Sequence, residues 1–445
     1  MVTALENNML NDLSLSMEIP PDTAFACPVV NAAKTLAERM GIGQRESFRF
    51  QLTVEEFCLC LIGLVQTDKP LRIVLTGKCY LLRVAFSFKA SNLSLGGLNI
   101  TANAAVRVQG EPPRDLGMLL AAKAADRFRV EHEGGDSFRV LAEVDKRYPE
   151  LASVHVAGNP RPPFRLARAP NAARLSQAAA LALGAYPNWQ CPASFRTPER
   201  FVDLVADSQV ACVCALDATG QTVGLLSWTP CSERALLFSG PFIFAPKETR
   251  SGAARLLVDT FLQSVARERY AIVLSFRATE DLPPGYFEPL GYLQGCTEDC
   301  CRQQPVIFRH LQEDMGQAVW CSPRVEDFLR QAYDRLAMPR DILPVEEPTG
   351  RPRRESLLGT TLDHGRDLAE LRPFLDGEDM AANLSAHVTA IRDKGIRRIL
   401  CYMDLAHPWE AALASDLFRS GFTPKVVLPH GGQGDMVVWQ HDQTY

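Results

Sequence analysis

The sequence predicts a mixed α/β protein in which helices are layered against several β-sheets. Its 445 residues are 47% hydrophobic and 22% charged, enough apolar surface to bury real cores. Helix-like and strand-like patterns alternate along the chain. Proline-rich stretches at 158–163 and 344–354 interrupt them, because proline fixes φ and removes a backbone donor. At about 150 residues per domain, we expect units over residues 1–155, 160–310 and 320–445.

Charge and cysteine content narrow the function classes. The formal net charge is −5, whereas broad nucleic-acid binding usually shows a basic excess. No apolar run reaches the ~18 residues of a membrane span. The first 16 residues are polar, unlike a signal peptide. We therefore expect a cytoplasmic protein that binds neither nucleic acid nor membrane.

The cysteines are expected to be free thiols. There are 13 of them at irregular spacing, as in a protein of a reducing compartment. Cys296, Cys300 and Cys301 form the densest cluster, but the second ligand pair of a structural zinc site is missing. No metal site is expected.

The first unit alternates helical and strand periodicity. Its glycine pair Gly134-Gly135 is typical of a hairpin turn. Apolar residues three and four apart predict helices, and alternating ones predict strands. The expected elements are helices at 28–40, 48–65 and 115–125, and strands at 71–75, 80–88, 128–132 and 137–144.

The second unit contains a strongly amphipathic helix at 252–268, with Leu256, Leu257 and Phe261 on one face. Strands are expected on either side of it, at 236–244 and 271–276. A strand, a helix and a second strand in this order predict a parallel βαβ unit. The remaining elements expected in the second and third units are helices at 198–206, 379–394 and 409–420, and strands at 210–216, 222–229, 396–403, 423–428 and 436–440.

The segment that opens the 252–268 helix has the chemistry of an anion site. Backbone N–H groups at a helix start are unsatisfied, and the helix dipole favours a phosphate there. The small residues Ser251, Gly252, Ala253 and Ala254 would let a ligand approach, and Arg250 could add charge. A surface loop capped by small residues is the alternative interpretation.

Residues 160–310 resemble the acyl-CoA-binding core of the GNAT acetyltransferase superfamily. That family has a strand, a pyrophosphate loop of the form Arg/Gln-x-x-Gly-x-Gly/Ala, a long helix, a strand and a closing Tyr-Glu-x-x-Gly-Phe motif. Here the loop at 249–254 reads TRSGAA, in which Thr249 departs from the pattern, and the closing motif at 287–292 reads FEPLGY. The resemblance implies acetyl-CoA as the cofactor, held by Pro241, Phe242, Ile243, Arg250, Ser251, Gly252, Ala253 and Ala254.

The resemblance also implies where catalysis would occur. A backbone N–H near residues 241–243 would polarise the thioester carbonyl. The family's frequent general acid is a tyrosine at the position of Phe287, which cannot donate a proton. The adjacent Tyr286 is therefore the candidate catalytic residue, with a packing aromatic as the alternative. The candidate bases, interpreted as solvated loop carboxylates, are Glu248, Glu280 and Asp281.

The third unit ends in a helix, a Gly-Phe pair at Gly421 and a strand, which resembles the closing half of a second GNAT-like fold. It has no loop like that at Gly252. The glycines of 431–434 lack the lysine and helix of a Walker motif, so we expect a hairpin tip. The histidines expected at the surface are His407, His430 and His441.

The first unit resembles the GHKL ATPase fold of anti-sigma-factor kinases, through residues 52–56 (LTVEE) and 116–120 (LGMLL). The family's Mg²⁺-binding Asn would fall at Cys60, and a thiol is a poor ligand for this hard ion. The Asp-x-Gly that reads adenine is missing near residues 86–89. The resemblance implies a GHKL-like α/β sandwich, ahead of two GNAT-like mixed-sheet units, with Glu56 structural and neither ATP nor Mg²⁺ as cofactor.

Two functions follow. One is an acyl-CoA-dependent N-acetyltransferase with a regulatory, ATP-incompetent N-terminal module; the loop at Gly252 favours it. The other is a non-catalytic regulatory or scaffold protein that binds protein partners through degenerate GHKL and GNAT folds. Cys60, Thr249 and Phe287 favour this second reading. We expect a protein partner.

Overall fold

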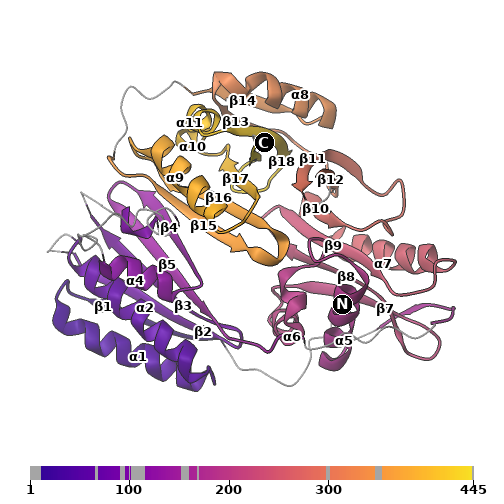
Figure 1. Ribbon diagram of the computed structural model, residues 1–445, viewed down its shortest axis with the longest axis horizontal. Coiled ribbons are helices and arrows are strands. Elements are labelled where there is room, and N and C mark those ends of the chain that lie inside the picture. The colour runs from indigo at the N-terminus through magenta and orange to yellow at the C-terminus, as the bar shows by residue number, and fades with distance from the viewer. Residues whose placement is uncertain are drawn as a thin grey trace.

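The chain folds into helix-covered β-sheets, which confirms the expected mixed α/β layers (Figure 1). Cys300 and parts of both proline-rich breaks lie outside the described residues. The described helices include none long and apolar enough to span a membrane. The computed structural model describes residues 12–65, 69–90, 96–99, 101, 116–151, 160–167, 170–296, 301–345 and 353–442.

The first sheet is antiparallel and lies under three helices. Leu71, Ile73 and Leu75 alternate with more exposed residues and bury one face of the sheet in a common cluster with the helices. The strand order is β1-β2-β3-β5-β4. The bounds are β1 (Leu13–Ile19), η1 (Thr23–Phe25), α1 (Ala26–Arg39), α2 (Gln44–Ile62), β2 (Leu71–Lys78), β3 (Leu81–Lys89), η2 (Gly96–Leu98), α4 (Leu116–Ala124), β4 (Arg127–Gly134) and β5 (Ser137–Asp145).

The second sheet has seven strands in the order β11-β12-β10-β9-β8-β7-β6. Its β9 and β10 run parallel and are joined by α7, as the βαβ pattern predicts. The bounds are β6 (Arg165–Leu166), α5 (Ala172–Ala185), η3 (Ala193–Arg196), α6 (Pro198–Ala206), β7 (Ala211–Leu216), β8 (Thr222–Pro230), β9 (Ala235–Ile243), α7 (Arg250–Val265), β10 (Ile272–Ala278), β11 (Glu288–Cys296) and β12 (Cys301–His310).

The ladder is interrupted in the middle of β9. Gly240 has φ +104°, and a Cβ there would lie 2.9 Å from the amide nitrogen of Phe242. This bulge reverses which face of the sheet the following side chains occupy. Phe238 therefore packs against α7, whereas Phe242 packs against α5 and α6. Pairing between β9 and β10 stops at Gly240. The last three residues of β9 therefore have no partner strand on the β10 side.

The third sheet has the order β15-β16-β17-β19-β18, with β16 and β17 parallel and joined by α9. The helix expected at 409–420 is divided into two short ones. β13 (Gln317–Cys321) and β14 (Arg340–Pro344) pair with each other in a separate two-stranded parallel sheet. The other bounds are η4 (Pro323–Val325), α8 (Glu326–Leu336), β15 (Leu357–Asp363), η5 (His364–Arg366), β16 (Leu368–Leu375), α9 (Met380–Asp393), β17 (Arg398–Asp404), α10 (Pro408–Ala411), α11 (Ala414–Arg419), β18 (Phe422–Leu428) and β19 (Met436–His441).

The second and third sheets share one hydrophobic core. A single cluster of buried side chains extends from β10, β11 and β12 into β17, β18 and β19. A Cβ on Gly291 of β11 would lie 3.0 Å from the side chain of Val426 of β18. The side-chain amide of Gln440 accepts from the backbone N–H of Gln294 and donates to its carbonyl, both at 2.8 Å. This core crosses one of the expected domain boundaries. The boundaries themselves stay a prediction.

A buried ion-pair network stabilises the third unit. Arg340 of β14 contacts the carboxylates of Asp435 at 2.6 Å and Asp314 at 2.8 Å, and the side chains of Arg340 and Asp435 are both 0% exposed. The prediction that His430 lies at the surface is wrong. Its backbone N–H donates to Asp435 and its Nε2 lies 3.3 Å from Asp314, so the network holds it inside.

We expect Asp435→Ala to lower the free energy of unfolding by about 3–5 kcal/mol, because it leaves Arg340 buried with one carboxylate fewer. The matched control is Glu326→Ala, which removes the exposed partner of Arg330 and should cost under about 1 kcal/mol. Urea unfolding of the full chain measures both. Equal losses would contradict a dominant role for the buried network.

Candidate functional site

The first turn of α7 is open, as an anion site requires. Its N-cap Thr249 makes no side-chain capping bond, and no acidic residue lies in the first turn. Ser251 and Gly252 are exposed, and a Cβ on Gly252 would meet nothing within 4 Å. The side chains of Ala253 and Ala254 are fully buried against the sheet. A ligand can therefore reach the amides of this turn only from the side of Ser251 and Gly252.

The strand edge beside this turn is occupied by the chain's own side chains. The backbone N–H of Ile243 donates to the Tyr186 hydroxyl at 2.6 Å. The Ile243 carbonyl accepts from Arg250 Nη2 at 2.7 Å, so Arg250 is turned inward, away from the open turn. Tyr186 in turn donates to Asp281 at 2.5 Å. Burial raises the pKa of the Tyr186 phenol, which keeps this donor neutral.

Asp281 is not the solvated loop carboxylate that was expected. Its side chain is 11% exposed and lies 3.4 Å from Arg250 Nε. Pro241 has no amide hydrogen, and its carbonyl accepts from the Thr279 hydroxyl at 2.5 Å. The Phe242 ring is fully buried. In the predicted polarising region, the Ile243 N–H already donates to Tyr186.

Tyr286 lies in the segment between β10 and β11 and contacts α7 away from its start. Its hydroxyl donates to Asp259 at 2.7 Å, and this hydrogen bond raises the pKa of the phenol. Asp259 follows Arg250 by nine residues, roughly 13 Å along a helix. The structure thus groups Ile243, Arg250 and the α7 start together, and holds Tyr286 apart from them.

Glu56 and Cys60, the two motif positions of the first unit, face α4. A Cβ on Gly117 would lie 2.7 Å from the Glu56 carboxylate and 3.0 Å from the Cys60 sulfur. The two side chains are therefore packed close against the start of α4. The GHKL resemblance itself stays a prediction.

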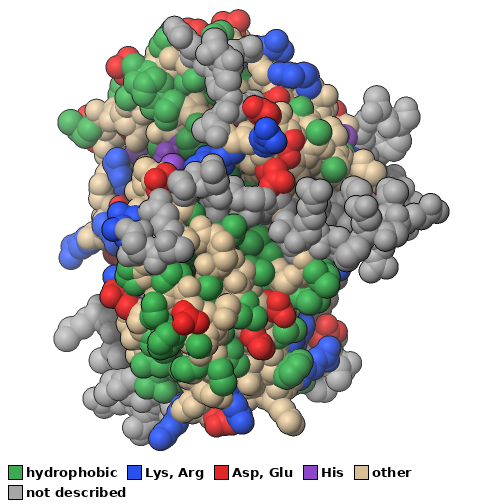
Figure 2. Space-filling view, turned by 90° about the vertical axis from the view of Figure 1, so that its left-hand side faces the viewer, with side chains coloured by type: hydrophobic (Ala, Val, Ile, Leu, Met, Phe, Trp, Pro, Cys, Tyr) green, Lys and Arg blue, Asp and Glu red, His purple; other side chains and the backbone are tan. Residues whose placement is uncertain are grey.

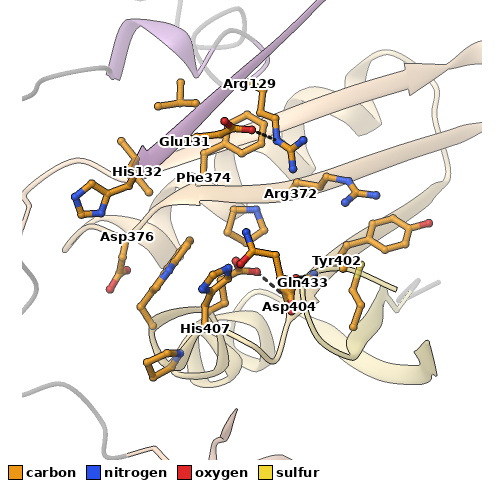
Figure 3. A pocket seen from close by; sticks show the side chains of 18 of the residues that line it. Arg129, Glu131, His132, Arg372, Phe374, Asp376, Tyr402, Asp404, His407 and Gln433 are labelled. Carbon is orange, nitrogen blue, oxygen red and sulfur yellow. Dashed lines mark hydrogen bonds and ion pairs between the residues drawn. The ribbon is translucent and has the colours of Figure 1, made fainter. Parts of the chain in front are cut away.

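A cleft of about 1600 Å³ lies where the three sheets meet, and none of the predicted cofactor residues lines it (Figure 3). Side chains of β4 form one wall, the end of β16 crosses the centre, and the end of β17 with the β18–β19 loop forms the other wall. The labelled lining residues are Arg129, Glu131, His132, Arg372, Phe374, Asp376, Tyr402, Asp404, His407 and Gln433.

Asp404 organises the floor of this cleft. Its carboxylate accepts backbone N–H bonds from Gln433 at 2.7 Å and Gly434 at 3.1 Å. A Cβ on Gly432 would lie 2.1 Å from the same carboxylate, so only glycine fits there. The glycine-rich 431–434 segment is the loop of the β18–β19 hairpin, as expected, and it wraps a carboxylate of its own chain.

Glu410 is the titratable group that stands out in the cleft. It is 9% exposed, and burial raises its pKa to about 8. Its carboxylate accepts the backbone N–H of Asp404 at 2.7 Å. A carboxyl that titrates near neutral pH can take up or release a proton.

Within the described ranges, no group of three or more His, Cys, Asp or Glu is placed to hold a metal ion.

No protein-family model and no curated protein matches the chain. Among solved structures it is similar to a candidate acetyltransferase from Acinetobacter baylyi, with 15% identity over 34% of this chain and 94% of that one and a TM-score of 0.25. It is also similar to the GNAT family N-acetyltransferase YhbS from Escherichia coli, solved in complex with CoA, with 21% identity over 36% and 86% of the two chains and a TM-score of 0.24. At this level of similarity, function rests on the geometry of the chain's own residues.

We expect Glu410 to reduce the stability of the folded chain as the pH rises from about 4.5 to about 8, because the folded state then holds a proton on Glu410 that the unfolded state has lost. Glu410→Gln should remove this contribution, a few kcal/mol at most over the whole pH range, so that stability falls less or rises more with pH than in the wild type. The exposed cleft residue Glu233 provides the control, since Glu233→Gln should keep the wild-type slope. Chemical unfolding at several pH values measures it, and an unchanged slope in Glu410→Gln would show that Glu410 is ionised in the folded chain.

Proposed function

We propose that the chain is an acyl-CoA-binding protein of GNAT-like architecture that holds the pyrophosphate at the start of α7. The observation that carries this is the open first turn at Gly252, free of carboxylates, beside a strand edge that β10 leaves unpaired. Backbone amides at a helix start are ready donors for phosphate oxygens. The choice of acyl-CoA follows from the sequence resemblance at 249–254 and 287–292.

The polar arm of an acyl-CoA would compete with Tyr186. An extended amide-bearing arm beside β9 would use the N–H and carbonyl of Ile243, which Tyr186 and Arg250 now satisfy. Ligand binding would replace these hydrogen bonds and would not add new ones, so the net gain in binding free energy is small. We propose that Tyr186 is an internal substitute for the ligand and weakens binding.

Calorimetric titration of CoA tests this proposal. We expect Gly252→Glu to weaken binding at least tenfold, about 1.4 kcal/mol, because a carboxylate would face the phosphates. Tyr186→Phe should tighten binding, since it frees the Ile243 N–H. Gln263→Glu places the same charge at the far, exposed end of α7 and should change little. Absence of binding at millimolar CoA, or equal affinities in all four proteins, would rule the site out.

Transfer chemistry should not depend on Tyr286. Its hydroxyl donates a hydrogen bond to Asp259. We therefore expect the Tyr286→Phe variant to release CoA from acetyl-CoA at the wild-type rate. The assay uses a lysine peptide as acceptor and chromatographic detection. A positioned general acid contributes typically 10²–10⁴-fold. A loss of that size would instead identify Tyr286 as the acid of an N-acetyltransferase.

The second candidate is a non-catalytic regulatory protein that binds a protein partner through its first unit. The observation that favours it is the exposed apolar surface there: Phe48 is 66% exposed, and hydrophobic side chains gather over the lower part of the molecule in Figure 2. Such surfaces mark interaction sites when they are contiguous. The exposed large hydrophobic residues of this unit are Leu13, Leu15, Phe25, Phe48, Leu59, Leu116 and Leu120.

A further inference from the structure

A second cavity of about 220 Å³ lies between the second and third sheets. Its lining contains four arginines and a single carboxylate, that of Glu370. Arg277 comes from the end of β10, and the other three come from the third unit, at η5, β16 and the start of β17. The four arginines are Arg277, Arg366, Arg372 and Arg398.

These charges are poorly compensated by the protein. Among the described residues, only Arg366 of the four has a carboxylate partner, Asp363 at 2.6 Å. Arg372 lies over the Tyr402 ring, 4.8 Å from its centroid. The Nε of Arg398 is buried without a hydrogen-bond partner. Arg277 makes no side-chain hydrogen bond or ion pair within the described chain.

The pKa values of two of these arginines are lowered, chiefly by burial. Burial, followed by the charge of Arg366, lowers the pKa of Arg277 to about 10. Burial likewise lowers the pKa of Arg398. Both arginines are partly buried and carry their charge at neutral pH, and charges withdrawn from water are normally paired. An anion in the cavity would supply the missing partner.

We propose that this cavity binds a small oxyanion ligand, either a phosphate or a dicarboxylate, between Arg277 of the second unit and Arg398 of the third. A guanidinium fork matches the paired oxygens of both groups. The volume corresponds to roughly seven water molecules at ~30 Å³ each, too small for a whole CoA. Arg372 and Tyr402 line both this cavity and the large cleft, so the two spaces are adjacent.

The site is independent of the one proposed at α7. The ligand would bridge the two units across their shared core, so binding should stabilise the folded chain. Ligands that bind only the folded state raise the unfolding temperature with concentration. Replacing an unpaired, partly buried arginine by methionine should remove this response without lowering the stability of the ligand-free protein.

Thermal unfolding of the full chain tests the inference, with inorganic phosphate and succinate as probes against sodium chloride of equal ionic strength. We expect at least one probe to raise the wild-type midpoint, by about 2–4 °C. The response should vanish in Arg277→Met and in Arg398→Met. It should persist in Arg330→Met, which alters an exposed arginine, and in Gly252→Glu. A response to phosphate alone identifies a phosphoryl ligand, and a response to succinate alone a dicarboxylate.

Three results would overturn the inference. Neither probe raises the wild-type midpoint above that in chloride; both methionine variants keep the response; or Gly252→Glu abolishes it, which would place the anion at α7. The unfolding midpoints of the methionine variants without ligand show whether these variants are folded. A variant that has lost the ligand-induced rise in midpoint is therefore not confused with one that fails to fold.

Discussion

The packing of the second sheet against the third is the constraint on which the rest of the structure depends. Gly291 allows β11 to approach β18 closely, and Gln440 of β19 makes paired hydrogen bonds to Gln294 of β11. Because the two sheets share one core, the end of β10 faces β16 and β17 across the arginine-lined cavity. Both the cleft and the arginine-lined cavity are consequences of this contact, since each is lined by more than one unit.

The end of β9 shows a second constraint, which acts on function. The bulge at Gly240 ends the pairing with β10 and leaves the Ile243 groups to be satisfied some other way. Buried backbone donors are rarely left unpaired, and Tyr186 fills this role. Under the proposed function an extended ligand would use the same edge, and Tyr186 would compete with it.

The sequence predicted the local elements well and the long-range contacts poorly. The periodicity around Leu257 and the strands beside it sufficed for the βαβ unit. Helix α5 was not predicted, although Asn171, whose side chain accepts from the Arg174 N–H, was a usable capping signal. The burial of Asp281 depends on Tyr186, 95 residues away in the chain. The cleft likewise combines segments from three units, and no local pattern encodes such a meeting.

A crystal structure of the chain with CoA tests the central claim most directly. The account predicts the pyrophosphate on the amides of Ser251 and Gly252, with the Tyr186 hydroxyl displaced from the Ile243 N–H. CoA bound in the large cleft instead, or bound at α7 with the contact between Tyr186 and Ile243 intact, would contradict it.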